Sequence, residues 1–230
     1  MLSKLVPVSG DLLKENLGLS PEDRQMITEE CNIIFNIAAS VDFNSRLDQA
    51  IEINIDGALR MQQLAKDCKN IECFTHMSTS YVNSDKRGFI EEKIYDVDFD
   101  VEQHINYIKS LSVEELEKQT PAILGDFSNS YTFTKSMSER LMRKHRGDLP
   151  TFIIRPAIVG CSFEEPFPGW VDNISAAGSM IFFAGIGIIR DGIGDITKVG
   201  GIIPVDFVVN ATIIGTSYHA NKNELIVHNS

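Results

Sequence analysis

Apolar residues along the chain fall into short runs that alternate with longer stretches of helical spacing. The short runs, which are typical of strands, cover residues 4–8, 32–37, 73–77, 151–154 and 224–228. We expect the run at 32–37 (NIIFNI) to form a continuously buried strand. Residues 20–31 predict a helix because Ser20 can cap it and Pro21 suits its first turn, and residues 45–69 repeat apolar side chains at helical intervals.

Strands that alternate with helices of this length form a parallel sheet through right-handed crossovers. The sequence therefore predicts an α/β fold, a Rossmann-like doubly wound parallel sheet. Ligands of such sheets bind at the carboxyl ends of the strands. The residues at the carboxyl ends of the predicted strands are mostly small or polar, and they are Gly10-Asp11, Ala38-Ala39-Ser40, His76-Met77-Ser78-Thr79-Ser80 and Arg155-Pro156. Tight loop packing would explain Ala38 and Ala39 equally well, and turn capping is the commoner role of a Ser or Thr.

A predicted helix around residues 129–142 carries chemistry on one face and apolar side chains on the other. Tyr131, Lys135, Ser138 and Met142 share one face at 100° per residue, and Phe133, Met137 and Leu141 share the opposite one. A phenol and an ammonium one turn apart can contact the same bound molecule, and the positive charge should lower the phenol pKa. Tyr131 is therefore a candidate proton donor, although a surface lysine beside a half-buried tyrosine gives the same pattern.

Composition narrows the classes of function. The 230 residues carry 21 basic and 32 acidic side chains, a net charge of −11, which argues against nucleic-acid binding. The four cysteines form no C-x-x-C pair, so we expect neither a metal site nor disulfides, and a reducing, intracellular compartment fits. The longest apolar stretch, residues 180–189, is shorter than the roughly 18 residues of a membrane span, so the chain as it stands reads as soluble.

Several blocks together resemble the alcohol-forming fatty acyl-CoA reductases, members of the extended short-chain dehydrogenase/reductase superfamily. The blocks are residues 6–11 (VPVSGD), 34–43 (IFNIAASVDF), 53–57 (INIDG), 74–83 (FTHMSTSYVN), 131–135 (YTFTK), 154–160 (IRPAIVG), 165–173 (EPFPGWVDN) and 203–210 (IPVDFVVN). The Y-x-x-x-K block is common to the superfamily. The blocks PFPGW-x-DN and IPVD-x-VVN distinguish the fatty acyl-CoA reductases from other members of the superfamily. The first of them disfavours the alternative of a sugar-nucleotide or steroid enzyme.

The resemblance implies a role for each matching residue. Tyr131 matches the catalytic acid, Lys135 the lysine that holds the nicotinamide ribose, and Thr79, with Ser78 as the second candidate, the hydroxyl that steadies the substrate carbonyl. The implied cofactor-binding residues are Asp11 and Leu12 at the adenine end, Ala38, Ala39, Asn54, Tyr131, Lys135, and Pro156 and Ile158 beside the nicotinamide. Phe167 and Trp170 would line a wall for the acyl chain, whereas a plain loop that packs an apolar helix explains them without the resemblance.

The implied reaction reduces a long-chain acyl-CoA to an aldehyde and then to a primary alcohol, a precursor of waxes and ether lipids, with NADPH as hydride donor. Relatives lie on the cytosolic face of peroxisomal or endoplasmic-reticulum membranes, and membrane association is expected only of a full-length parent. Metal ions and nucleic acid have no implied role, and the oligomeric state stays open.

One feature of the family is missing from the sequence. Residues 1–60 contain no Gly-x-x-Gly-x-x-Gly or Gly-x-Gly-x-x-Gly turn to hold the cofactor pyrophosphate, and the glycines at 185, 187, 192 and 194 have the wrong spacing. We therefore expect residues 1–230 to be one partial NAD(P)-binding reductase domain, incomplete at its N-terminal end, with a substrate-side segment at about 160–203. Its sheet should expose an apolar edge. The alternative function is a catalytically inactive remnant that acts as a binding protein.

Overall fold

The computed structural model describes residues 2–173, 176–192, 195, 197 and 200–230. Its main sheet has four parallel strands in the order β1-β2-β3-β6, which are Ile33–Asn36, Cys73–Met77, Thr151–Arg155 and Leu225–Asn229. A second, two-stranded parallel sheet pairs β4 (Ile158–Gly160) with β5 (Ile202–Pro204). The predicted α/β Rossmann-like parallel sheet is confirmed, because each pair of neighbouring strands in the main sheet is parallel.

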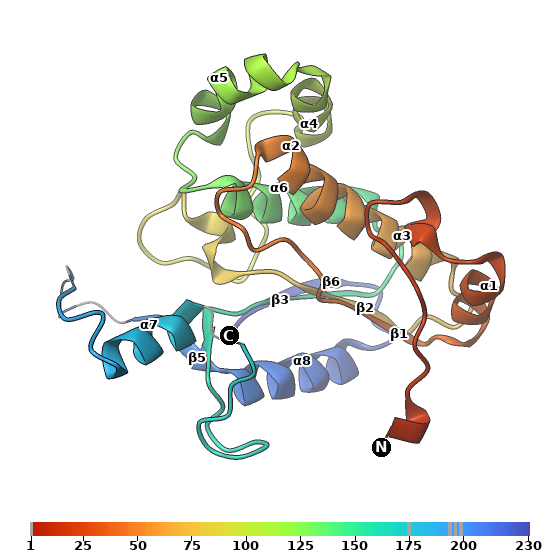
Figure 1. Cartoon of the computed structure of the whole chain (residues 1–230). Coiled ribbons are helices and arrows are strands. Elements are labelled where there is room, and N and C mark those ends of the chain that lie inside the picture. Colours follow the sequence, from red (N-terminus) through yellow and green to blue (C-terminus); the bar gives the residue numbers. More distant parts are fainter. Residues whose placement is uncertain (1, 174–175, 193–194, 196, 198–199) are drawn as a thin grey trace.

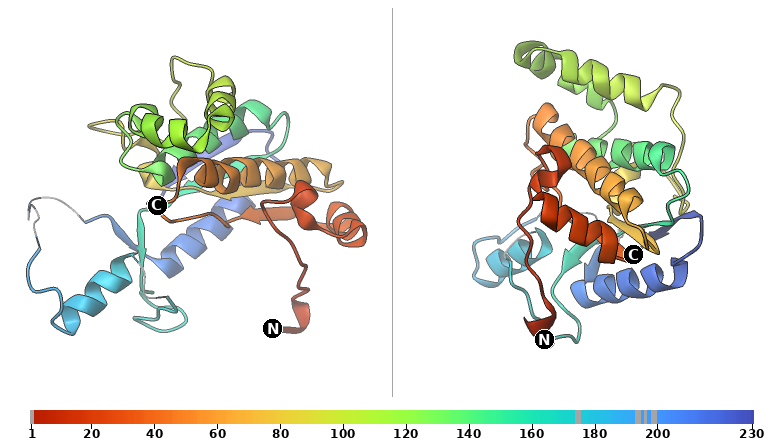
Figure 2. Two further views of the ribbon diagram at one scale, coloured as in Figure 1. Left: turned by 45° about the horizontal axis from the view of Figure 1, so that its top comes forward. Right: turned by 90° about the vertical axis from the view of Figure 1, so that its right-hand side faces the viewer.

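Helices lie on both sides of the main sheet. The helices of the described chain are α1 (Pro21–Glu30), α2 (Leu47–Ile51), α3 (Ala58–Asp67), α4 (Val101–Ser110), α5 (Val113–Leu124), α6 (Ser130–His145), α7 (Ala176–Gly185) and α8 (Val205–His219), with short helical segments η1 (Leu2–Lys4), η2 (Glu15–Gly18), η3 (Glu52–Gly57) and η4 (Ser80–Asn83). Figure 1 shows α3 and α6 on one side of the sheet and α8 on the other, with α4 and α5 farther out beyond α6. The turned views of Figure 2 show the same layers.

The helices expected from the sequence form where their capping residues predict. Ser20 accepts a hydrogen bond from the Asp23 N–H at 3.0 Å, and Pro21 opens α1. The expected helix at 45–69 is a nearly continuous run of α2, η3 and α3, in which η3 is a π-helical turn. Such turns inside α-helices often mark functional positions.

Two apolar clusters lie on the α6 side of the sheet. One joins Phe74 of β2 to Ala65 of α3 and Met142 of α6, and the other joins Ile51 of α2 and Ile108 of α4 to Phe133 of α6. Helix α6 contributes to both, so residues 132–142 are buried without interruption. The packing holds α6 firmly above the carboxyl ends of β1 and β2.

Two expectations about the N-terminal third are wrong. The expected strand at residues 4–8 does not form. Lys4 ends η1, residues 5–8 pair with no strand in the described part of the chain, and Leu5 and Val6 are exposed. Strand β1 is also not buried on both faces. Its residues alternate between exposed and buried. Of the main-sheet strands α8 packs chiefly against β2 and β3, and Ile33 and Phe35 are exposed at the edge of the sheet, in line with the expected apolar edge.

The C-terminal half carries much exposed apolar surface. On α8, the exposed residues include Phe207, Ile213 and Ile214, while Thr216 faces inward and shares a 2.7 Å hydroxyl hydrogen bond with Thr75 of β2. In the described part of the chain, no helix is both long enough and apolar enough to cross a bilayer.

Candidate active site

Helix α6 places the predicted reactive face at the carboxyl ends of β1 and β2. Asn129 caps the helix by accepting a hydrogen bond from the Thr132 N–H at 2.9 Å. Phe133, Met137 and Leu141 all lie in the apolar cluster formed with α2, α4 and α5. The expected apolar back of the helix is therefore confirmed, whereas Met142, expected on the opposite face, lies in the other apolar cluster.

Tyr131 is half-buried at the start of this reactive face. Its ring lies 5.5 Å from the ring of Phe43, measured between centroids. Burial raises the pKa of the phenol above its ordinary value, and a hydrogen bond with Thr79 opposes the rise without cancelling it. The expectation that the Lys135 charge would lower this pKa is wrong for this structure, because desolvation of the phenol has the larger effect.

Lys135 is almost fully buried, and its amine points into the sheet. The Nζ atom donates to the Met77 carbonyl at 2.6 Å and lies 3.1 Å from Nε2 of His76. Burial lowers the pKa of Lys135 to about 8, with the Glu139 carboxylate acting in the opposite direction. The lysine therefore titrates close to neutral pH.

The two predicted hydroxyls differ in what holds them. Ser78 donates to the Glu139 carboxylate at 2.5 Å, and Arg155 donates to both oxygens of the same carboxylate, from Nε at 2.9 Å and from Nη2 at 2.5 Å. Thr79 instead faces Tyr131. Ser78 is thus engaged with Glu139, whereas Thr79 caps η4 by accepting a hydrogen bond from the Tyr81 N–H at 3.3 Å and also lies beside Tyr131.

Two residues of the site, Asn36 and Glu139, were not singled out in the sequence, and His76 and Arg155 were named there only for their positions at strand ends. All four are buried, with at most 2% of their surface exposed. A signal did exist, because polar side chains inside apolar runs need partners. His76 interrupts the run at 73–77, and Asn36 interrupts the run at 32–37.

Asn54 in η3 ties the loop after β1 to α6. Its Oδ1 accepts from the Ser40 N–H at 2.9 Å, and its Nδ2 donates to the Ser40 carbonyl at 3.1 Å and to the Thr134 hydroxyl at 3.1 Å. Ala38 and Ala39, just before Ser40, are exposed and half-buried respectively. This loop therefore presents small side chains and open backbone beside the reactive face of α6.

The loops after β2 and β3 are joined in the same region. The Ser80 N–H donates to the Pro156 carbonyl at 2.9 Å, which brings the segment after Thr79 against the end of β3. Ile158 follows in β4 and is half-buried. Pro156 and Ile158 thus border the same side of the sheet as Thr79.

Asp11 and Leu12 lie apart from this group. The Asp11 carboxylate accepts from the Leu13 N–H at 2.9 Å, and Leu12 packs against Gly57, where an added Cβ would come within 3.2 Å of the leucine side chain. Arg60 of α3 donates to the Leu12 carbonyl at 2.5 Å.

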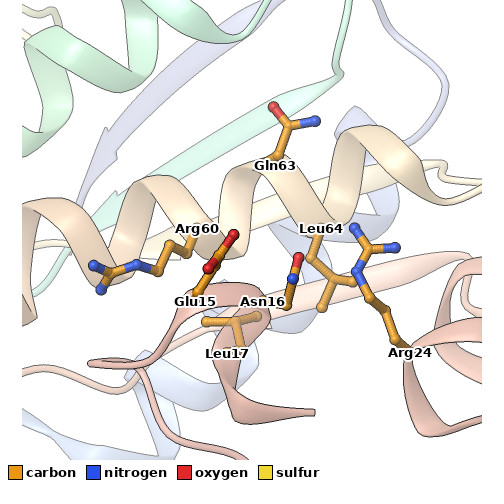
Figure 3. Close-up of a pocket in the computed structure, with 7 residues that line it drawn as sticks. All are labelled: Glu15, Asn16, Leu17, Arg24, Arg60, Gln63 and Leu64. Atoms are coloured by element: carbon orange, nitrogen blue, oxygen red, sulfur yellow. The ribbon is translucent and has the colours of Figure 1, made fainter. Parts of the chain in front are cut away.

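Arg60 also lines a cavity of about 210 Å³ between the 15–17 segment, α1 and α3, which Figure 3 shows in close-up. A second arginine that lines the cavity, Arg24, forms an ion pair with Asp67 at 2.5 Å. None of the predicted site residues lines this cavity.

Phe167 and Trp170 belong to a loop anchored by Asp206. The carboxylate of Asp206 accepts hydrogen bonds from three backbone N–H groups, those of Phe163, Glu164 and Glu165, at 2.9, 2.8 and 3.1 Å. Desolvation raises the pKa of Asp206, but these hydrogen bonds outweigh it and bring the pKa to about 2.

The loop contributes to a small cavity. Trp170 lines about 150 Å³ of space with Val159, Gly178 and Val205, and Phe167 is 58% exposed. The substrate-side segment expected at 160–203 includes residues 174–175, 193–194, 196 and 198–199, which lie outside the described residues together with the glycine at 194.

Fold and site together define a Rossmann-like reductase domain of the short-chain dehydrogenase/reductase kind, with Tyr131, Lys135 and Thr79 at the carboxyl ends of the strands. The family model for NAD-binding domains described as "Male sterility protein" matches residues 1–212, and the chain belongs to this family.

Curated relatives agree with this assignment. The chain is 36% identical to fatty acyl-CoA reductase 2 of Mus musculus over 99% of its own length and 44% of the relative's length. It is 34% identical to fatty acyl-CoA reductase 1 of Xenopus laevis, over 97% of the chain and 44% of that relative. The chain therefore spans less than half of the length of the relatives it matches.

Solved structures share the fold. The terminal R domain of the myxalamid biosynthetic pathway superposes with a TM-score of 0.62 at 23% identity, over 92% of this chain and 46% of that one. RMD from Pseudomonas aeruginosa, solved with NADPH, superposes with a TM-score of 0.57 at 19% identity, over 98% of this chain and 66% of that one. At these identities the likeness concerns the fold alone.

The buried Glu139–Arg155 pair should be a main source of stability. Removing one partner leaves the other charge buried and unpaired, so Glu139→Gln or Arg155→Met should each lower the free energy of unfolding by about 3–5 kcal/mol. The double variant Glu139→Met/Arg155→Met should cost less than the sum of the two single changes. Urea unfolding followed by circular dichroism measures these values.

The exposed pair Lys69–Glu29, whose side chains are 66% and 44% exposed, is the matched control. Lys69→Met should lower the free energy of unfolding far less than either single change at the buried pair. Equal costs for the exposed and the buried pair would contradict the prediction.

Proposed function

We propose that this chain carries the catalytic centre of an alcohol-forming fatty acyl-CoA reductase that uses NADPH. The observation that carries the proposal is the grouping of Tyr131, Thr79 and Lys135 at the carboxyl ends of the strands, where Thr79 lies beside the phenol and the Lys135 amine donates to the Met77 carbonyl at the end of β2. The curated relatives named fatty acyl-CoA reductases support the substrate class, which is a long-chain acyl-CoA.

The residues around the site fit the nicotinamide half of the proposed cofactor. Ala38 and Ala39 leave room against the backbone, Asn54 holds their loop through Ser40, and Pro156 and Ile158 border the opposite side. Lys135 and Tyr131 would hold the ribose. Residues 1–60 contain no glycine-rich turn for the pyrophosphate, and Asp11 and Leu12 are proposed for the adenine end on the resemblance alone.

The chemistry divides between these side chains. NADPH, when bound, supplies the hydride. Thr79 donates a hydrogen bond to the carbonyl oxygen as it gains negative charge, and Tyr131 gives that oxygen a proton. The raised pKa of Tyr131 suits this direction of reaction, because it keeps the phenol protonated at neutral pH. Two rounds, each consuming one NADPH and one proton, would complete the reduction. In the first the C–S bond breaks and CoA leaves as its thiol, which gives the aldehyde, and in the second the aldehyde becomes a primary alcohol.

Phe167 and Trp170 are proposed to contact the acyl chain. Their loop is pinned by Asp206, and the apolar helix α7 follows it closely in sequence. For the whole protein we propose the cytosolic face of peroxisomal or endoplasmic-reticulum membranes, on the resemblance alone.

Replacing the proposed acid tests the function most simply. Tyr131→Phe should lower the rate of acyl-CoA-dependent NADPH oxidation by about 10²–10⁴-fold, because the proton donor is lost while the ring remains. The control is Tyr107→Phe, since Tyr107 is 48% exposed and donates to Gln119. It should keep the full rate. A Tyr131→Phe rate within twofold of the parent would sink the proposal, and a folded parent without turnover would favour the alternative of an inactive binding protein.

The proposed acyl wall predicts a dependence on chain length. Trp170→Ala should raise KM for a sixteen-carbon acyl-CoA severalfold more than KM for a four-carbon one, because only the longer chain would reach the indole. Phe89→Ala, at a side chain that is 90% exposed, is the control and should change neither value. Equal effects of Trp170→Ala on both KM values would contradict the proposal that Trp170 contacts the acyl chain.

A further inference from the structure

A chain of three buried polar side chains runs from β1 through β2 to α6. Asn36 Nδ2 lies 3.0 Å from Nδ1 of His76, and Nε2 of His76 lies 3.1 Å from Nζ of Lys135. At most 2% of each residue is exposed, so water does not replace any of these contacts. The Lys135 amine makes one further hydrogen bond, to the Met77 carbonyl at 2.6 Å.

We propose that Asn36 and His76 are positioning residues of this site, and that the Asn36–His76–Lys135 chain fixes both the place and the charge of the Lys135 amine. The coupling follows from the hydrogen-bond chemistry of the three groups alone. Its consequence for catalysis rests on the proposed reductase function.

The direction of donation along the chain can take only two forms. A protonated lysine can only donate, so Nε2 of His76 must then accept, Nδ1 must carry the ring proton, and Asn36 must present its Oδ1. A neutral lysine can accept from a protonated Nε2, and Nδ1 then accepts from the Asn36 amide nitrogen. With the Asn36 amide oriented as it is here, the Nδ2–Nδ1 contact corresponds to the second form, and the turned amide corresponds to the first.

The second form is open only to a neutral lysine, whereas the first accommodates the ammonium, so the orientation of Asn36 biases the charge on Lys135. Turning the amide exchanges oxygen and nitrogen at almost no change in shape, so the same packing accommodates either form. A side chain at position 36 that can only accept should favour the ammonium. An apolar side chain at position 76 removes the acceptor and should favour the neutral amine.

The other charged and titratable groups near Lys135 do not replace this control. On α6, Tyr131 lies one turn before the lysine, and Glu139 lies one turn after it and raises its pKa. Glu139 is already bound by Arg155 of β3 and by Ser78. His76 of β2 is the group in direct contact with the amine, and burial together with the Lys135 charge holds its own pKa well below the ordinary value. The imidazole is therefore neutral, and only its tautomer can change.

The test measures the titration of Lys135 itself. In the full 230-residue chain labelled with ¹⁵N at lysine Nζ, the Lys135 signal is assigned by its loss in Lys135→Met and followed by NMR from pH 6 to 11. Asn36→Asp should raise the Lys135 pKa by about one unit or more, because an ionised carboxylate can only accept. His76→Leu should lower the same pKa by about one unit, because the ammonium loses a hydrogen-bond acceptor.

Two further variants separate this role from a purely structural one. His76→Gln should keep the Lys135 pKa close to the parent value, since its amide oxygen can take the place of Nε2. Thr75→Val changes the neighbouring buried residue of β2, whose hydroxyl bonds Thr216 of α8, and should leave the lysine titration unmoved even if stability falls. Should His76→Leu fail to fold, Asn36→Asp and His76→Gln still decide the matter.

Shifts of opposite sign in Asn36→Asp and His76→Leu would support the inference. An unchanged Lys135 pKa in both, or shifts of the same sign, would overturn it. The readout needs no catalysis, so a chain without reductase activity that still shows the opposite shifts would contradict the proposed function and leave this inference standing.

Discussion

The site depends on the ion pair between Glu139 of α6 and Arg155 of β3. Two hydrogen bonds in parallel, at 2.9 and 2.5 Å, join the guanidinium to the carboxylate in an environment where both side chains are at most 2% exposed. A pair with this geometry can offset the cost of taking two charges out of water. Because Glu139 lies on the same helix as Tyr131 and Lys135, the pair fixes the height and rotation of the reactive residues above the sheet.

The pair also engages one of the two predicted hydroxyls, that of Ser78. Ser78 completes the coordination of the Glu139 carboxylate, whereas Thr79 is directed at the phenol of Tyr131. Neighbouring residues at the end of one strand point to opposite sides, so Ser78 faces Glu139 while Thr79 faces Tyr131 and caps η4. The hydrogen bonds of Asn54 to Ser40 and Thr134 likewise hold the loop after β1 against α6. A connected set of buried polar groups thus lies between the apolar clusters and the carboxyl ends of the strands.

Much of the fold was readable from the sequence, because the apolar runs at 73–77 and 151–154 match β2 and β3 closely and Ser20 caps α1 as expected. Contacts between segments distant in sequence determined the features that the sequence did not predict. Residues 5–8 have strand-like composition but no neighbour to pair with, and one face of β1 is exposed because α8 ends its coverage at β2. The grouping of Tyr131, Lys135 and Thr79 followed from helical spacing and strand ends. The engagement of Ser78, the burial that raises the Tyr131 pKa and the role of His76 depend on contacts between distant segments, which local patterns do not encode.

The central claim is that the ends of β1, β2 and β3 together with α6 hold a nicotinamide cofactor. An equilibrium titration of the folded 230-residue chain with NADPH, followed by cofactor fluorescence and repeated with NADH and with the Lys135→Met variant, tests it most directly. Saturable binding of NADPH that weakens at least tenfold in Lys135→Met is the expected result. A folded chain that shows no saturable binding of either cofactor would contradict the claim.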